Sequence, residues 1–189
     1  MFLRLSLILI FCFSAMTAAA DTADIGFNDQ SFQFIYERAI TADEYGTSLV
    51  NGRFLYNDDK DTRLGSFGLD FIGEPGNIPG LSLGAGAKAY LGKTHSNVDF
   101  ANLAIGVRAD YLLPQLQGLG VAGRFFYAPK VFSFRDSERL LEGEVRLTYM
   151  VLPKVKAYLG YQNTRFDVEN RSGHTTADDS IRIGFVGSF

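Results

Sequence analysis

The sequence has no tryptophan, two histidines, five prolines and one cysteine among its 189 residues. The cysteine, Cys12, lies in the first 20 residues, so the rest of the chain has neither a disulfide nor a catalytic thiol. Basic residues are also few, with 18 Lys and Arg against 21 Asp and Glu. A net charge of −3 does not provide the basic surface that nucleic-acid binding requires, and we expect no nucleic-acid partner.

Long apolar runs are missing after residue 20, where no stretch reaches the roughly 18 apolar residues of a membrane helix. The first 20 residues differ. Arg4 precedes an apolar run at 5–13, and three alanines at 18–20 precede Asp21. This layout predicts a cleaved signal peptide over 1–20 and one mature domain over 21–189. A retained N-terminal anchor is the alternative, for which the run is short.

The mature chain is rich in glycine and aromatic residues and alternates with a period of two. Val145, Leu147 and Tyr149, for example, alternate with charged or polar residues, as in a β-strand with two different faces. Many segments are longer than the five or six residues of a typical soluble strand and suit a strand that crosses a membrane at a tilt. Nine segments show the pattern: 31–39, 45–56, 63–73, 80–92, 98–111, 118–128, 138–152, 154–168 and 178–189.

Single-chain bacterial barrels have an even number of strands, so a further short strand at 24–29 is expected. We therefore predict an all-β fold, a closed antiparallel up-and-down transmembrane β-barrel of ten strands, with eight as the alternative. Polar and mostly longer connections at 57–62, 93–97, 130–137 and 169–176 alternate with shorter or Pro-containing ones at 41–44, 74–79, 114–118 and 152–154. This asymmetry is typical of outer-membrane barrels, which carry their long loops outside.

In such a barrel the apolar face meets lipid and the polar face lines the lumen. Aromatic residues near the strand ends of the apolar face fit interfacial girdles: Tyr36, Tyr56, Phe71, Tyr111, Tyr127, Tyr149 and Phe189. The predicted lumen residues have mixed charges: Glu37, Arg53, Asp70, Lys88, Arg108, Asp110, Arg124, Glu142, Glu144, Arg146, Lys156 and Arg182. They are interpreted as a salt-bridged polar core, or as a narrow conduit of weak anion preference lined by Arg108, Arg124, Arg146 and Arg182.

The chain ends in a strand whose alternate residues are apolar: Ile181, Ile183, Phe185 and, at the terminus, Phe189. We expect them to face lipid while the strand pairs with the first strand and closes the barrel. A terminal aromatic residue also resembles the signal read by the barrel-assembly machinery. That machinery, outer-membrane lipid and lipopolysaccharide are the expected partners, and the outer membrane of a Gram-negative bacterium is the expected location.

Several stretches resemble the YfaZ family of Gram-negative outer-membrane proteins. They are "RFLYNDDKD" (53–61), "LGAGAKAYLG" (83–92), "RFFYAP" (124–129), "YMVLPKVKAYLGYQN" (149–163) and the terminal strand ending in Phe189. The resemblance covers nearly all the mature chain. It implies an outer-membrane β-barrel, sometimes called porin-like, with no assigned activity, catalytic residues or cofactor.

Enzymatic chemistry would have to use His95 beside Ser96, or His174 near Thr175, Asp178 and Asp179. Nothing in their spacing indicates that a nucleophile, a base and an orienting group come together, so no catalytic residue is predicted. The acidic stretch 57–61 lacks the glycine and distal glutamate of a calcium loop, so no metal site is predicted either. The expected function is that of a porin-like barrel with a narrow or plugged lumen. The alternatives are a small lipid-modifying enzyme of the outer membrane and a soluble secreted barrel that carries a ligand.

Overall fold

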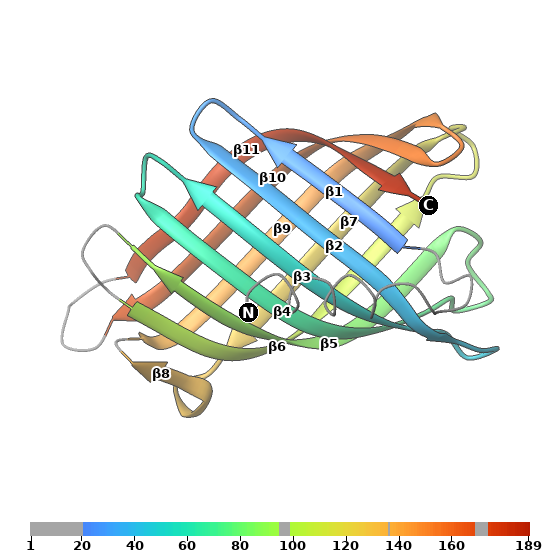
Figure 1. Cartoon of the computed structure of the whole chain (residues 1–189). Helices are drawn as coiled ribbons and strands as arrows, with labels where there is room; N and C mark the ends of the chain where they lie inside the picture. Colours follow the sequence, from blue (N-terminus) through green and yellow to red (C-terminus); the bar gives the residue numbers. More distant parts are fainter. Residues whose placement is uncertain (1–20, 95–98, 136, 169–173) are drawn as a thin grey trace, which may run out of the picture.

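The computed structural model describes residues 21–94, 99–135, 137–168 and 174–189. The predicted signal peptide at 1–20, His95 and Ser96 lie outside these residues. The described chain consists almost entirely of β-strands (Figure 1). Their bounds are β1 (Asp21–Phe27), β2 (Ser31–Ala42), β3 (Thr47–Asn57), β4 (Thr62–Gly73), β5 (Leu81–Lys93), β6 (Asp99–Leu112), β7 (Leu119–Ala128), a 3-10 turn η1 (Lys130–Phe132), β8 (Ser133–Arg135), β9 (Ser137–Leu152), β10 (Val155–Val168) and β11 (His174–Ser188).

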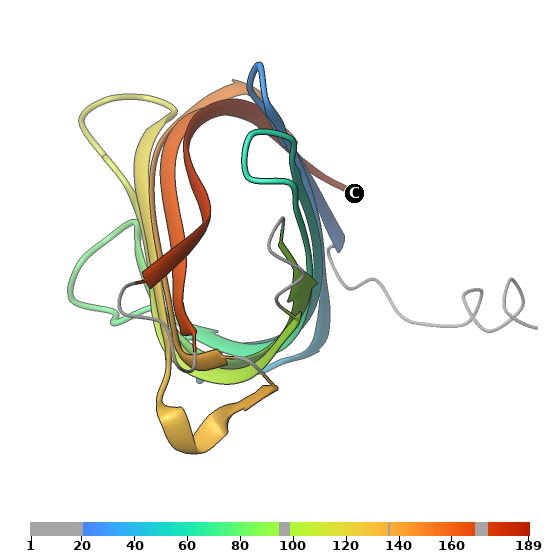
Figure 2. The same cartoon turned by 90° about the vertical axis from the view of Figure 1, so that its left-hand side faces the viewer.

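Ten of these strands form a closed antiparallel ring, which confirms the predicted barrel. The order runs β5-β4-β3-β2-β1-β11-β10-β9-β7-β6, and β5 pairs with β6 to complete the ring. Figure 2 shows the ring nearly end-on. The short strand β8 was not predicted. It pairs with β6 at Phe100–Asn102, beyond the point where β7 stops pairing at Ile105, because the chain leaves the wall after Pro129 and returns through η1.

The seam of the barrel joins the first described residue to the last. The amide of Asp21 donates to the carbonyl of Phe189 (3.1 Å), and the amide of Phe189 donates back to Asp21 (3.0 Å). The predicted strand at 24–29 is therefore real but begins earlier, at Asp21, and ends at Phe27. Closure matters because a free sheet edge would leave unpaired backbone groups, which hydrocarbon cannot satisfy.

The barrel has two different ends. The loop end carries the connections after β1, β3, β5, β7 and β10, and the terminal end carries those after β2, β4, β6 and β9 together with Asp21 and Phe189. The excursion through η1 and β8 lies at the loop end and protrudes from the wall (Figure 2). The predicted length asymmetry is only partial, because the 74–80 connection at the terminal end is longer than the 28–30 and 58–61 turns at the loop end.

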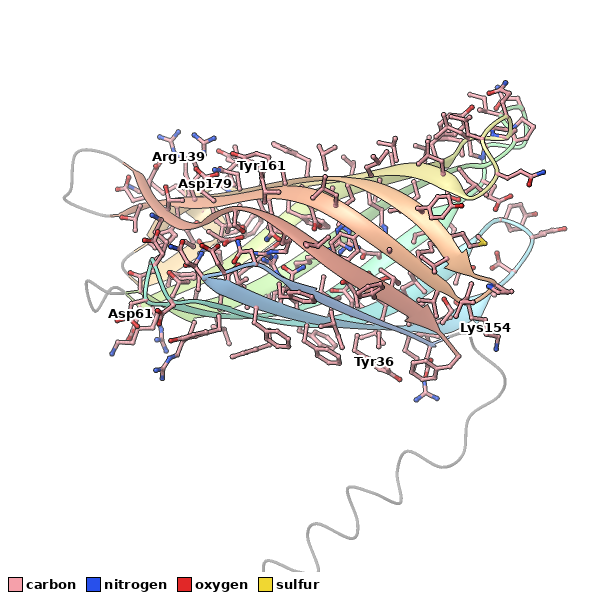
Figure 3. The ribbon with its side chains drawn as sticks, turned by 90° about the horizontal axis from the view of Figure 1, so that it is seen from above. Tyr36, Asp61, Arg139, Lys154, Tyr161 and Asp179 are labelled. Atoms are coloured by element: carbon pink, nitrogen blue, oxygen red, sulfur yellow. The ribbon has the colours of Figure 1, made fainter. Side chains whose placement is uncertain are left out.

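The outer wall is apolar and the inner face is polar over most of its height. In β4, Leu69 is 55% exposed, whereas the neighbouring Asp70 is 5% exposed. The same alternation runs around the ring, so large apolar side chains cover the outside (Figure 3). On the outer wall, the hydroxyls of Tyr36 and Tyr161 donate to Asp21 (2.6 Å) and Asp179 (2.8 Å), so each ring combines an apolar body with a polar contact. In the described residues we find no helix long and apolar enough to cross a membrane.

Candidate functional site: the barrel lumen

The half of the lumen nearer the loop end is filled by an apolar layer. Its side chains are inward-facing and at most 1% exposed: Leu55, Leu64, Tyr90, Phe100, Ala104, Phe126, Ala128, Leu140, Phe166 and Ala177. The rings of Phe100 and Phe166 stack with centroids 4.6 Å apart, although they come from β6 and β10. The ammonium of Lys88 lies 3.9 Å from the centre of the Phe126 ring, a cation–π contact between this layer and the charges beyond it.

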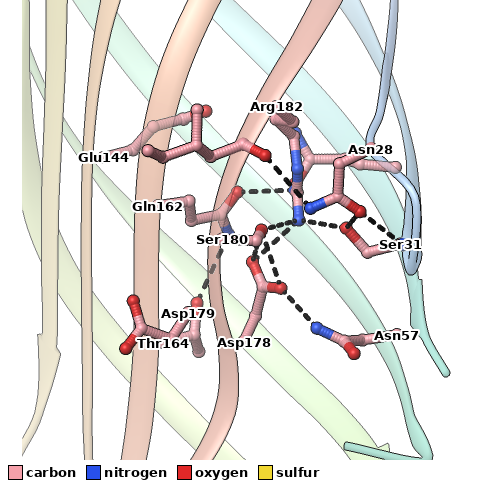
Figure 4. Close-up of polar contacts among 12 residues, drawn as sticks. Asn28, Ser31, Asn57, Glu144, Gln162, Thr164, Asp178, Asp179, Ser180 and Arg182 are labelled. Atoms are coloured by element: carbon pink, nitrogen blue, oxygen red, sulfur yellow. Dashed lines mark hydrogen bonds and ion pairs between the residues drawn. The ribbon is translucent and has the colours of Figure 1, made fainter. Parts of the chain in front are cut away.

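Beside the apolar layer, Arg182 organises a hydrogen-bonded cluster (Figure 4). The side chain is 1% exposed, and its guanidinium donates to the carboxylate of Asp178 at 2.9 Å. It also donates to Gln33, Gln162, Ser31 and Ser180 at 2.7–3.0 Å. Sequence analysis placed Arg182 with three other arginines along a conduit. Its two terminal nitrogens instead donate to these acceptors, and Arg182 does not line the cavity shared by Arg108, Arg124 and Arg146 that is described below.

Ion pairs cross the middle of the lumen. Arg53 of β3 donates to Glu142 of β9 at 2.5 Å, and Arg108 of β6 donates to Glu37 of β2 at 3.0 Å. Both pairs join strands on different sides of the ring. Because each charge is buried, its pairing across the lumen offsets part of the cost of removing it from water.

A second group of ion pairs is centred on Arg146. Its guanidinium donates to Asp24 and Glu144, each at 2.5 Å, and lies 4.1 Å from the centre of the Tyr158 ring. The Tyr158 hydroxyl donates to the other oxygen of Asp24 at 2.9 Å. Arg124 is held more loosely than its neighbours, and its nearest carboxylate oxygens lie 3.7 Å away on Glu144 and 4.0 Å away on Glu37.

A cavity of about 370 Å³, lined in part by charged side chains, lies between these ion pairs and the terminal end. Asp24, Glu37, Arg108, Arg124 and Arg146 line it, and residues of the terminal-end turns and of the barrel seam surround its mouth. Of the twelve predicted lumen residues, Asp110 and Lys156 lie at this mouth. The other ten are buried or half-buried inside the ring: Glu37, Arg53, Asp70, Lys88, Arg108, Arg124, Glu142, Glu144, Arg146 and Arg182.

Sequence reasoning missed part of this site. Asp24 was not chosen because the first strand was expected only from the even strand count, and its short pattern did not mark an inward face. Gln33 was not recognised as a partner of Arg182 because the two residues lie 149 positions apart. Asp178 lies only four positions before Arg182, but it was considered only as a neighbour of His174. Tyr158, which stacks on Arg146, gave no sign in the sequence that it contacts a buried charge. The apolar layer was also missed, since inward apolar residues weaken the two-residue pattern from which the faces were assigned.

The structure also locates the other residues that sequence analysis singled out. Ile181, Ile183, Phe185 and Phe189 all point outward and are 51–65% exposed. His174 begins β11, but its side chain lies outside the described part of the structure. In the 57–61 stretch, Lys60 pairs with Asp59 at 2.5 Å and Asn57 donates to Asp178 at 2.8 Å. Among the described residues, no three His, Cys, Asp or Glu side chains are grouped as a metal site would need.

Comparison with solved structures supports the fold. The outer membrane protease OmpT from Escherichia coli aligns with a TM-score of 0.50 at 14% identity, over 90% of this chain and 93% of that one. The KdgM porin aligns at 0.42 and 10% identity, over 90% and 99%. The translocator domain of the autotransporter NalP from Neisseria meningitidis aligns at 0.42 and 13% identity, over 98% and 92%. At these identities we use the likeness to OmpT for the fold alone.

A search of curated proteins found no match. A family model described as "YfaZ precursor" matches residues 3–189, which is nearly the whole chain. The word precursor agrees with the signal peptide expected at 1–20. The predicted resemblance is confirmed, and this chain belongs to the YfaZ family.

Proposed function

We propose that this protein is an outer-membrane barrel that does not form an open pore. The observation that carries the proposal is the apolar layer, whose side chains are at most 1% exposed. Side chains buried this completely are out of contact with water, which supports a lumen that is plugged at that level. The Arg53–Glu142 pair, with side chains 4% and 2% exposed, narrows the middle of the lumen as well.

Planar-bilayer recording of the refolded protein tests this proposal. Wild-type protein is expected to give no current steps. The double variant Phe100→Ala/Phe166→Ala, which removes the stacked ring pair, is expected to give measurable leak. Phe125→Ala is the matched control, because Phe125 is 47% exposed and points away from the lumen. Regular steps from wild-type protein would show that the lumen conducts and would contradict the proposal.

The outer membrane of a Gram-negative bacterium is the proposed location. The ten-stranded ring and its apolar outer wall support this proposal. Lipid and lipopolysaccharide would cover the outer wall, and the barrel-assembly machinery would insert the chain. The protein should stay with membranes during a salt wash, dissolve in detergent and migrate differently on a gel before and after heating. Release by salt alone would instead favour a soluble carrier.

We further propose that the barrel has no enzymatic role. Most of the lumen charges that we describe are paired with one another, several of them across the ring, and their arrangement supports a structural core. The test is to replace both histidines, His95→Ala/His174→Ala, and to compare the lipid composition of the membrane with that of wild-type cells. A change in lipid acylation in the variant would favour the lipid-modifying alternative.

A further inference from the structure

The cavity at the terminal end is closed at its deep side and open at its mouth. Its deep wall is made by Asp24, Glu37, Arg108, Arg124 and Arg146, which belong to five different strands. Beyond them, towards the loop end, lies the buried apolar layer. A cavity of about 370 Å³ with this shape can hold a small solute that enters from the terminal end.

Arg124 is the base on this wall with the most free donor capacity. Arg108 and Arg146 each donate at least one hydrogen bond of 3.0 Å or shorter to a carboxylate. Arg124 has carboxylate oxygens only at 3.7 and 4.0 Å, and we find no hydrogen bond donated by its guanidinium to the described residues. A guanidinium carries five N–H donors, and a half-buried one gains when an acceptor is added. Arg124 can therefore accommodate a further hydrogen-bond acceptor, such as a carboxylate.

Charges along the cavity indicate what kind of acceptor fits. The lining has four acids and four bases: Asp24, Glu37, Glu74, Asp110, Arg108, Arg124, Arg146 and Lys156. The balance disfavours a multiply charged anion, which would be repelled by the carboxylates beside each arginine. Glu74 and Asp110 line the cavity on the side of the terminal-end turns. The Asp110 side chain is 44% exposed. A positive group on the solute would find partners there.

We propose that this cavity binds a small zwitterion of amino-acid size, with its carboxylate on Arg124 and its ammonium towards Glu74 and Asp110. The planar guanidinium can hold a carboxylate through two parallel hydrogen bonds, which a lysine cannot do. Asp24 and Glu144 keep Arg146 in place beside it. The site does not depend on a sealed lumen, so binding and conductance can be judged separately.

The absence of tryptophan from the chain makes free L-tryptophan a suitable probe. Its fluorescence anisotropy would be followed during titration with the refolded full-length mature protein in detergent. Saturable binding to wild-type protein is expected. Tryptamine, which lacks the carboxylate, is expected not to bind. Indole-3-propionate, which lacks the ammonium, is expected to bind more weakly, and equal binding would overturn the role given to Glu74 and Asp110.

Variants locate the site. Arg124→Gln should weaken tryptophan binding by about tenfold or more, because the variant loses a charge-assisted hydrogen bond to the carboxylate. Arg139→Gln is the matched control, because Arg139 is exposed at the opposite end (Figure 3) and should leave binding unchanged. Arg124→Lys keeps the positive charge but lacks the planar guanidinium, so it should also bind tryptophan less tightly. This variant provides the test if Arg124→Gln does not fold. The proposal is overturned if tryptophan shows no saturable binding, if tryptamine binds equally, or if the folded Arg124 variants bind like wild type.

Discussion

Arg53 and Glu142 meet across the full width of the barrel. Their strands, β3 and β9, are five positions apart in the ring of ten, and the two side chains are joined at 2.5 Å. Both side chains are almost completely buried, at 4% and 2% exposed. The barrel is therefore braced through its interior as well as by the hydrogen bonds between neighbouring strands.

Breaking this brace on one side should destabilise the barrel strongly. Arg53→Met leaves Glu142 buried without its partner, so we expect the free energy of unfolding to fall by about 3 kcal/mol or more. Urea unfolding in detergent micelles, followed by gel mobility without heating, would measure the change. Arg53→Met/Glu142→Leu, which removes both charges, should recover most of the loss.

The control for this prediction is an exposed pair. Arg139 and Asp167 lie 3.6 Å apart with side chains 58% and 42% exposed, so Arg139→Gln should change the free energy of unfolding by less than about 1 kcal/mol. Similar losses in Arg53→Met and Arg139→Gln would mean that the lumen pair has no special role.

Glycines on the inner face should differ from glycines on the outer face. A Cβ at Gly106 would collide with the carbonyl of Phe125 and the ring of Phe126, whereas a Cβ at Gly143 meets nothing within 4 Å. Gly106→Ala should therefore reduce folding yield sharply. Gly143→Ala should leave stability unchanged or raise it by up to about 1 kcal/mol, because alanine loses less backbone freedom on folding. Comparing the fraction of compact protein after refolding distinguishes the two, and equal yields would contradict the packing described.

The terminal aromatic ring should matter for assembly more than for stability. The hydrogen bonds between Phe189 and Asp21 use backbone atoms only, so Phe189→Ala keeps them. If the ring is read by the assembly machinery, the variant should be inserted in cells several times less efficiently while its unfolding in detergent stays close to wild type. Phe185→Ala, an outward ring on the same strand, is the control. Normal insertion of Phe189→Ala would show that the ring is not the signal.

The barrel could be predicted from the sequence because the alternation of apolar and polar residues is visible within each strand. Alternation such as that around Leu147 assigns each residue of a strand to a face without knowledge of the neighbouring strands. The same reasoning did not predict β8, because the bend after Pro129 and the pairing with β6 depend on how far β7 extends.

The contacts of the lumen could be predicted only in part. The alternation assigned Arg146 to the inner face. Its pairing with Asp24 depends on ring size and strand tilt, which determine the residues that face each other across the lumen. The cavity beside Arg124 could not be predicted for the same reason. Its volume is the space that remains after opposite walls have packed against each other.

The most direct test of the account measures what the outer wall touches. Leu147 and Leu159 are direct neighbours on β9 and β10 and are 49% and 53% exposed. Because the only cysteine lies at position 12, within the predicted signal peptide, spin labels can be attached to single cysteines at these two sites in the mature protein reconstituted in bilayers. The account predicts strong relaxation by oxygen, which dissolves in hydrocarbon, and weak relaxation by a water-soluble nickel complex. Strong relaxation by nickel and weak relaxation by oxygen at both sites would show that this wall faces water and would contradict it.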